Sequence, residues 1–292
     1  RDLTINAMAI DILTTNLLDL HGGVTALSER KINFLHSRSV VDDPTRIIRA
    51  ARYASRLNFE LTDEAIHQIR EALNCWPWKW QHNQSPELAP PALATRLRME
   101  LEIMFEKESW IVALKNLQRW GALGLLDQGL QHDKRWPRRL LWASRLNLSP
   151  LTALIVGAKA PLNLAARLQL PKKQQRLIMK SLQLQKLLNS KTIPEDSLKW
   201  PPSEWCKMLE RNNIPPEAVA LTASLGITNW RPLFRWWARW RFIKASVSAK
   251  MLIEQGWRPG PELGAEVERL RLEKIDNELN QRPVLFQTNS PY

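Results

Sequence analysis

The sequence has few cysteines and no long hydrophobic run. Its two cysteines, Cys75 and Cys206, lie far apart and belong to no CxxC or Cys/His cluster, so they indicate neither a disulfide framework nor a zinc site. No segment approaches the roughly 18 consecutive apolar residues that span a bilayer, and no signal-peptide pattern follows Arg1. We therefore expect a soluble, cytoplasmic protein. Because residue 1 is not Met, we also expect either processing or a fragment of a longer chain.

Acidic charge is scarce in one region. The chain has 42 Lys and Arg residues against 29 Asp and Glu residues, a net charge of +13. Residues 1–100 are balanced, but residues 131–191 hold 13 basic residues and a single acidic one, Asp133. Such a charge density attracts polyanions through counterion release, although a solvated basic face is the alternative. The candidates for contact with nucleic acid are Lys134, Arg135, Arg138, Arg139, Lys172, Lys173, Arg176 and Lys180.

The order of hydrophobic and turn residues predicts a mainly α fold. Residues 3–20 contain two short extended runs separated by a Thr-Thr-Asn turn, and a Gly22-Gly23 turn follows. From Asp43 onward the pattern is helical, with prolines between helices of ordinary length. A hydrophobic fraction of 44% over 292 residues is enough for two or three subdomains. We expect a short β segment followed by a curved helical body.

Tryptophan is abundant, with 14 residues, several of them beside arginine. In residues 229–241 one helical ridge carries an arginine every four residues, at Arg231, Arg235 and Arg239. The aromatic residues that repeat every three positions lie away from this ridge; they are Phe234, Trp237 and Trp240. The pattern favours tryptophan as core filler between helices with arginines outside. Stacking of these aromatics on RNA bases is the alternative.

Residues 42–57 predict an amphipathic helix. Asp43 suits the N-cap, and Pro44 suits the first helical position. One face is apolar and is formed by Ile47, Ala50, Ala51, Ala54 and Leu57. The opposite ridge is basic and is formed by Arg46, Arg49, Arg52 and Arg56. Because four arginines in line repel one another, we expect the ridge to meet phosphate, carboxylate or water.

The pair Asp43 and Arg46 suggests a more specific function. A carboxylate accepts a hydrogen bond from an exocyclic amine, and a guanidinium donates one to a ring nitrogen or carbonyl. The pair is therefore complementary to the Watson–Crick edge of cytosine or adenine, whereas uracil and guanine present the reverse pattern. Arg49 and Arg52 would then be available for a triphosphate. Simple N-capping by Asp43 is the alternative.

Five segments in order resemble the motifs of class II tRNA nucleotidyltransferases and bacterial poly(A) polymerases. Residues 1–9 (RDLTINAMA) resemble the RRDxTxNA motif, beginning one residue late, and residues 42–49 (DDPTRIIR) resemble the EDPxRIxR helix. Weaker matches are residues 18–23 (LDLHGG) with a DPxGG turn, residues 96–101 (RLRMEL) with an RIxxEL neck motif, and residues 256–264 (GWRPGPELG) with a Pro-Gly-rich tail turn. Together these five matches cover most of the chain.

This resemblance implies a role for each matching residue. Asp43 and Arg46 would read the base of CTP or ATP, so that the template is made of protein. The other implied nucleotide-binding residues are Arg1 and Asp2 at phosphate and ribose, Asn6 in support of them, and Arg49 and Arg52 at the triphosphate. The sequence departs from the family pattern at Asp42, which replaces Glu, at Leu20 and His21, and at Ala26.

Catalysis in this family needs two metal-binding carboxylates on an early strand after a Gly-rich turn. Residues 1–42 contain no GGxxRD or DxD element, and Asp11 and Asp19 lie eight residues apart. We therefore expect no catalytic or metal-binding residue in this chain, and Mg²⁺ bound by a catalytic head outside it. The expected division is residues 1–28 as the end of the head, 29–95 as the neck, 96–160 as the body and 161–292 as the tail.

The resulting hypothesis is a tRNA nucleotidyltransferase that adds C and A, or A alone, to the tRNA 3′ end. This chain would hold the nucleotide-selecting and RNA-binding parts. Two alternatives stay open: a bacterial poly(A) polymerase, and a non-catalytic helical RNA-binding protein that works without a head.

Overall fold

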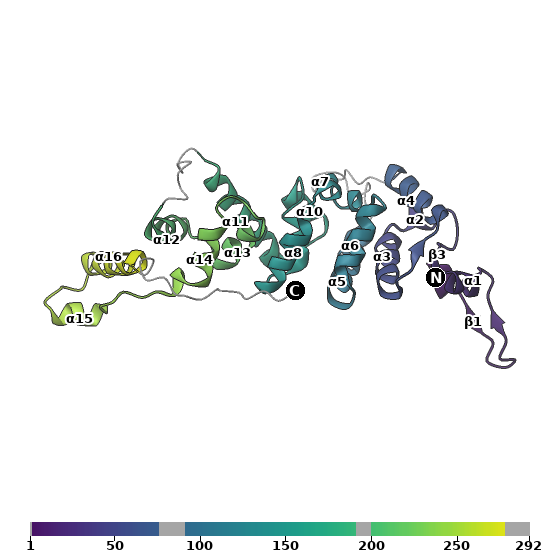
Figure 1. Cartoon of the computed structure of the whole chain (residues 1–292), viewed down its shortest axis with the longest axis horizontal. Coiled ribbons are helices and arrows are strands. Elements are labelled where there is room, and N and C mark those ends of the chain that lie inside the picture. Colours follow the sequence, from purple (N-terminus) through teal and green to yellow (C-terminus); the bar gives the residue numbers. More distant parts are fainter. Residues whose placement is uncertain (1, 76–90, 191–199, 278–292) are drawn as a thin grey trace, which may run out of the picture. The chain divides into compact units, whose positions relative to one another are not determined.

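The computed structural model describes residues 2–75, 91–190 and 200–277 (Figure 1). Helices dominate these residues and strands are few and short, which confirms the expected mainly α fold with a small β portion. The chain forms two compact units, Arg1–Met179 and Lys180–Tyr292. The division falls inside helix α11, Lys172–Leu188. None of the described helices is both long enough and apolar enough to pass through a membrane.

The first unit begins with a small antiparallel hairpin. Strand β1 (Ala9–Ile10) pairs with β2 (Leu17–Leu18), with Ala9 opposite Leu18. The two extended runs expected in residues 3–20 are thus present but short, because Thr4–Asn6 forms a 3₁₀ helix instead. After the hairpin Asp19 accepts hydrogen bonds from the N–H groups of Gly23 (2.7 Å) and Val24 (2.9 Å) and so caps the start of α1, Gly23–Ser28.

A second pair of strands brackets the helix on which the site is built. Strand β3 (Lys31–Ile32) pairs in parallel with β4 (Glu60–Leu61), and α2 (Ser39–Asp42) and α3 (Thr45–Leu57) lie between them in sequence. Helix α4, Asp63–Cys75, follows β4. The sequence pattern predicted helix throughout this region and missed β4, because a two-residue strand is too short to show an alternating period.

Helix α3 packs its apolar face against α5 (Pro91–Lys107) and α6 (Trp110–Arg119). The expected face is buried at Ile47, Ala50, Ala51 and Ala54, and Ile48 is buried as well. Leu57 differs: it is 37% exposed. It occupies the last position of the helix, before Asn58 turns the chain with a left-handed backbone, so no neighbouring helix covers it.

The remainder of the first unit is a series of short helices, of which α9 and α10 begin at prolines. They are α7 (Gln128–His132), α8 (Trp136–Arg145), α9 (Pro150–Ile155) and α10 (Pro161–Arg167). Trp136 is only 1% exposed, and its indole N–H donates to Gln118 at 3.1 Å. A large buried side chain with its polar atom satisfied anchors α8 on the core.

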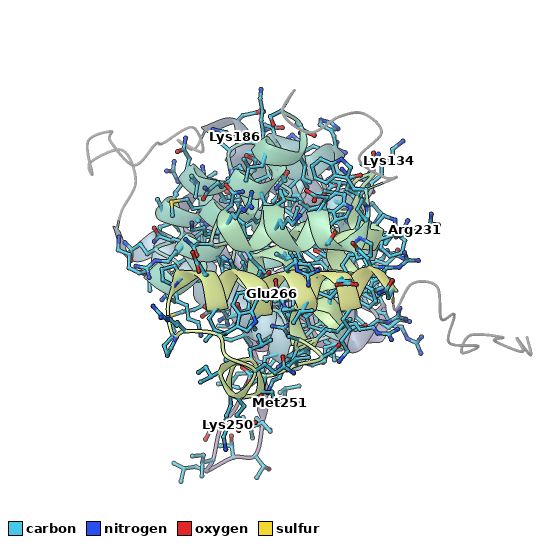
Figure 2. All side chains as sticks on the ribbon, turned by 90° about the vertical axis from the view of Figure 1, so that its left-hand side faces the viewer. Lys134, Lys186, Arg231, Lys250, Met251 and Glu266 are labelled. Atoms are coloured by element: carbon cyan, nitrogen blue, oxygen red, sulfur yellow. The ribbon has the colours of Figure 1, made fainter. Side chains whose placement is uncertain are left out.

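The second unit contains α12 (Pro202–Arg211), α13 (Pro216–Ser224), α14 (Trp230–Ala238), α15 (Ala249–Glu254) and α16 (Pro261–Asn277). Trp205, Trp236 and Trp240 are buried, as core-filling tryptophans should be. Trp237 is only half-buried and lies under the guanidinium of Arg241, at 5.7 Å. Arg231 is exposed and points outward from α14 (Figure 2). The tryptophans are therefore mostly core, with arginines outside.

An ion pair and its hydrogen bonds connect α12, α14 and α16 in the second unit. The guanidinium of Arg271 on α16 donates to both carboxylate oxygens of Glu210 on α12, each at 2.8 Å, and to the carbonyl of Ile243 at 3.0 Å. Trp236 on α14 donates to the same carboxylate at 3.2 Å. Burial raises the pKa of Glu210, but the hydrogen bond and charge of Arg271 outweigh it, so the pKa is lowered overall.

Candidate functional site

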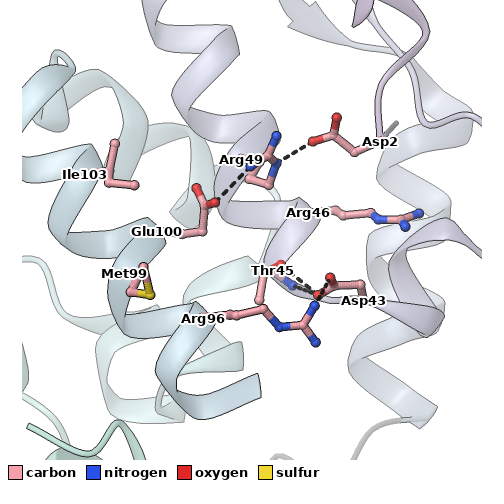
Figure 3. Close-up of a pocket in the computed structure, with 9 residues that line it drawn as sticks. All are labelled: Asp2, Asp43, Thr45, Arg46, Arg49, Arg96, Met99, Glu100 and Ile103. Atoms are coloured by element: carbon pink, nitrogen blue, oxygen red, sulfur yellow. Dashed lines mark hydrogen bonds and ion pairs between the residues drawn. The ribbon is translucent and has the colours of Figure 1, made fainter. Parts of the chain in front are cut away.

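A pocket of about 350 Å³ lies between α3, α5 and the segment that carries Asp2 (Figure 3). Four residues that the sequence singled out meet in it, although Asp2 and Arg49 are 47 positions apart in the chain. The lining consists of Asp2, Asp43, Thr45, Arg46, Arg49, Arg96, Met99, Glu100 and Ile103. The walls are therefore charged on two sides and apolar only at Met99 and Ile103.

Arg49 on α3 contacts both the N-terminal segment and α5. Its Nε donates to the carboxylate of Asp2, and its Nη1 donates to Glu100 Oε1 at 3.0 Å. Burial raises the pKa of Asp2, but the hydrogen bond and charge of Arg49, together with a hydrogen bond from Asn6, lower it overall. The hydrogen bond to Asp2 raises the pKa of Arg49. Asn6 is thus a second hydrogen-bond partner of the Asp2 carboxylate.

Asp43 stands at the start of α3 with its carboxylate held on both oxygens. Oδ1 accepts from the N–H of Thr45 at 3.1 Å and from its hydroxyl at 2.7 Å. Oδ2 accepts from Nη1 of Arg96 at 2.8 Å. The helix begins at Thr45, one residue later than expected, yet Asp43 still makes the bond to a first-turn N–H that an N-cap carboxylate makes. Capping and a place in the pocket are therefore compatible.

Arg46 lies one helical turn after Asp43 and lines the same pocket. Its Nη1 is buried and has no hydrogen-bond partner among the described residues. Figure 3 accordingly draws no bond from Arg46 to any of the other residues shown. Because an unpaired buried donor is unfavourable, this guanidinium is ready to receive an acceptor from a ligand.

The rest of the arginine ridge is occupied by carboxylates. Arg52 is 12% exposed and is held by Glu100 and by Glu108, the latter at 3.4 Å from its Nε. Arg56 donates to Glu108 at 3.1 Å from its Nε. Glu108 is almost completely buried, 1% exposed, so these arginines neutralise it. Arg52 therefore sits in an ion-pair network between α3 and α5 and does not line the pocket, contrary to its expected position at a triphosphate.

The wall contributed by α5 was not singled out by reasoning on the residues. Arg96 and Glu100, one helical turn apart, contact Asp43 and Arg49 on α3. The available signal was the segment 96–101, which resembles the neck motif and contains both residues. Arg1, the first expected phosphate contact, lies outside the described residues.

Most of the expected nucleic-acid contacts lie on the surface. The exposed ones are Lys134, Arg135, Arg138, Lys172, Lys173 and Arg176, while Lys180 is partly exposed and belongs to the second unit. Figure 2 shows Lys134 on the outside of the molecule. Arg139 differs, because it is 3% exposed, donates to the carbonyl of Ala153 at 2.6 Å and pairs with Asp133 at 2.6 Å. It is an interior residue that joins α8 to α9 and cannot contact phosphate from there.

Known proteins share parts of this sequence. The poly(A) polymerase head domain model matches residues 1–33. An A-adding tRNA nucleotidyltransferase of Aquifex aeolicus is 30% identical over 143 residues, 48% of this chain and 16% of the relative. A CC-adding tRNA nucleotidyltransferase of Deinococcus radiodurans is 33% identical over 136 residues, 44% of this chain and 31% of the relative. Parts of this chain are thus similar in sequence to class II tRNA nucleotidyltransferases. The matches span less than a third of the length of either of these two relatives.

Solved structures of tRNA nucleotidyltransferases share the fold. A CCA-adding enzyme in complex with ATP superposes with a TM-score of 0.65 at 21% sequence identity. The superposition covers 94% of this chain and 66% of the chain of that enzyme. The Thermotoga maritima CCA-adding enzyme in complex with tRNA superposes with a TM-score of 0.64 at 21% identity and covers 95% and 68%. The resemblance inferred from the five motifs is confirmed, and the helical units have the fold of these enzymes.

Proposed function

We propose that this protein adds C and A, or one of them, to the 3′ end of tRNA in the cytoplasm, with CTP and ATP as substrates. The observation that carries the proposal is the pocket in which the oriented carboxylate of Asp43 stands one helical turn from Arg46, whose buried Nη1 has no hydrogen-bond partner among the described residues. The kinship with A-adding and CC-adding tRNA nucleotidyltransferases supports it.

The pocket suits the Watson–Crick edge of cytosine or adenine. Asp43 accepts from the exocyclic amine, and Arg46 donates to the ring nitrogen or carbonyl beside it. Uracil and guanine would place a carbonyl against the carboxylate and an N–H against the guanidinium, so both contacts would be repulsive. The protein thereby takes the part of a template base.

Neighbouring residues are available for the other parts of the nucleotide. Asp2 lies in the pocket for the ribose, with Asn6 behind it, and Arg49 is 35% exposed on the pocket wall for the phosphates. Arg1 keeps its proposed phosphate contact by resemblance. Arg52, enclosed by Glu100 and Glu108, supports the wall instead. The exposed cations between Lys134 and Arg176 provide phosphate contacts for the RNA.

Mg²⁺ is part of the proposal through the family alone, because the described carboxylates do not fit a metal site. Asp2 and Glu100 are engaged by arginines, and Asp19 accepts two backbone N–H bonds. Within residues 2–75, 91–190 and 200–277, no group of three or more His, Cys, Asp or Glu side chains could hold a metal ion. We therefore derive no chemical step through a metal from these residues.

The test is nucleotide incorporation by the full-length protein. A tRNA that ends before its terminal CCA is incubated with each nucleotide alone and with CTP and ATP together, beside an unstructured RNA primer. Addition of C, A or both to the tRNA and little addition to the primer is the expected result. Long A tracts on both RNAs would indicate a poly(A) polymerase, and salt-dependent tRNA binding without incorporation would indicate a non-catalytic RNA-binding protein.

A further inference from the structure

Helix α5 places an arginine against the carboxylate that reads the base. Arg96 pairs with Asp43 at 2.8 Å, 53 positions away in the chain, and both residues line the pocket. Arg96 is 52% exposed and Asp43 is 19% exposed, so the pair stands at the edge of the pocket (Figure 3). The proposed contacts with the base are made by Asp43 and Arg46 and do not include Arg96.

The carboxylate of Asp43 is fixed by one anchor on each oxygen. Thr45 holds Oδ1 through both its N–H and its hydroxyl, and those two bonds alone would let Oδ2 swing about the anchored atom. Arg96 holds Oδ2 from a different helix. A carboxylate has about four lone-pair directions, so three bonds leave one acceptor direction, and it lies on Oδ2.

We infer that Arg96 is a positioning residue for nucleotide selection, which fixes the plane of the Asp43 carboxylate so that a single acceptor direction faces the base. This inference rests on the proposed function, because it assigns Asp43 the reading of an exocyclic amine. One free acceptor matches one amine N–H of cytosine or adenine. An unfixed carboxylate could turn away from the carbonyl of uracil or guanine and lose the repulsion that rejects it.

An alternative role for Arg96 is purely structural, as a link between α3 and α5. The surrounding contacts make that role redundant, since Arg49, Arg52 and Arg56 already join α3 to Glu100 on α5 and to Glu108 next to it. A structural role and a positioning role also differ in kinetics. Loss of a mere link lowers stability or weakens all nucleotides alike, whereas loss of positioning changes the ratio between them.

The experiment is a double-mutant cycle in the full-length protein. The variants are Arg96→Gln, Arg96→Lys, Asp43→Ala and the pair Arg96→Gln with Asp43→Ala. For each, kcat/KM is measured for CTP, ATP, UTP and GTP on a tRNA that lacks its terminal nucleotides, and melting temperature reports folding. Arg119→Gln is the matched control, because Arg119 is 57% exposed and pairs with Glu60 at 3.8 Å outside the pocket.

We expect Arg96→Gln to reduce the preference for C and A over U and G about tenfold, the size of effect that a charge-assisted hydrogen bond supports. Arg96→Lys should keep part of the preference, and Arg119→Gln all of it. In the Asp43→Ala background, Arg96→Gln should change the preference no further, because it acts through Asp43.

Different failures point to different errors. Equal loss for all four nucleotides in Arg96→Gln, or an effect that persists in the Asp43→Ala background, would overturn the positioning role and leave the proposed function intact. Unchanged preference in Asp43→Ala, or no incorporation by the unmodified protein, would overturn both.

Discussion

At the scale of single residues, the decisive feature is that charged groups are paired in a definite order. Asp2 meets Arg49, Arg49 meets Glu100, and Arg52 stands between Glu100 and Glu108. Each carboxylate is neutralised by an arginine from another segment, so the network closes long loops of chain. Arg46 alone among the ridge arginines keeps a buried nitrogen without a partner in the described part of the chain.

The Asp2–Arg49 pair makes folding stability depend on pH. The pKa of Asp2 is lowered below its ordinary 3.8 in the folded protein, so its stabilisation is present above that value and is lost as the pH falls through the folded pKa. We expect Asp2→Asn to be less stable than the unmodified protein at pH 6 and nearly equal to it at the lowest pH. Urea unfolding over a pH series that extends from 6 to well below 3.8 measures this. A difference that stays constant over that range would contradict the pairing.

At the scale of secondary-structure elements, helix α8 shows that helical periodicity and residue charge gave opposite predictions for the exposure of Arg139. Trp136, Arg139, Leu140 and Ala143 are the buried residues of α8 and lie at helical spacing i, i+3, i+4 and i+7. The period therefore placed Arg139 on the core face, and only its charge suggested the surface. Arg138, one position earlier, points away and is exposed.

Other features could not be read from local patterns. Helix α3, its apolar face and the participation of Asp43, Arg46 and Arg49 in one site followed from periodicity, capping and base chemistry. The α5 wall required knowing that Glu100 lies against Arg49, 51 positions away, and no local period encodes such a contact. The parallel pair β3–β4 joins two strands of two residues each, which is below the length at which alternation can be recognised.

The packing of α8 on α9 leads to a prediction at Gly157. A Cβ at this position would overlap the guanidinium of Arg139, which cannot retreat because Asp133 and the carbonyl of Ala153 hold it. We expect Gly157→Ala to lower the free energy of unfolding by about 1–3 kcal/mol, the usual effect of overpacking. Gly264→Ala is the control: its Cβ would meet nothing within 4 Å and it lies inside α16, so it should be neutral or stabilising by up to about 1 kcal/mol. Denaturant unfolding of both variants checks the pair, and equal effects would contradict the role of Arg139.

At the scale of the whole molecule, the excess positive charge is regional. The exposed cations from Lys134 to Arg176 belong to the first unit, as does the pocket, and residues 1–100 are electrically balanced. A nucleic acid held by such cations releases counterions, so binding weakens steeply with added salt.

This arrangement predicts a measurable salt slope. In tRNA-binding titrations at several salt concentrations, Arg138→Gln and Lys172→Gln should each reduce the slope of log K against log salt by about 0.7–0.9, the share of one phosphate contact. Lys31→Gln is the control, since Lys31 lies outside this set and pairs with Glu60 at 3.4 Å. Slopes unchanged by Arg138→Gln and Lys172→Gln would remove these residues from the RNA surface.

The unpartnered guanidinium nitrogen of Arg46 has a consequence for the evolution of this protein. A buried donor left unsatisfied in the ligand-free molecule is a local frustration, and under the proposed function a bound base would relieve it. Selection for folding stability alone would favour an apolar side chain at this position. Under the proposed function, retention of arginine at this position would reflect selection for base reading, and its replacement would mark a descendant that had lost that activity.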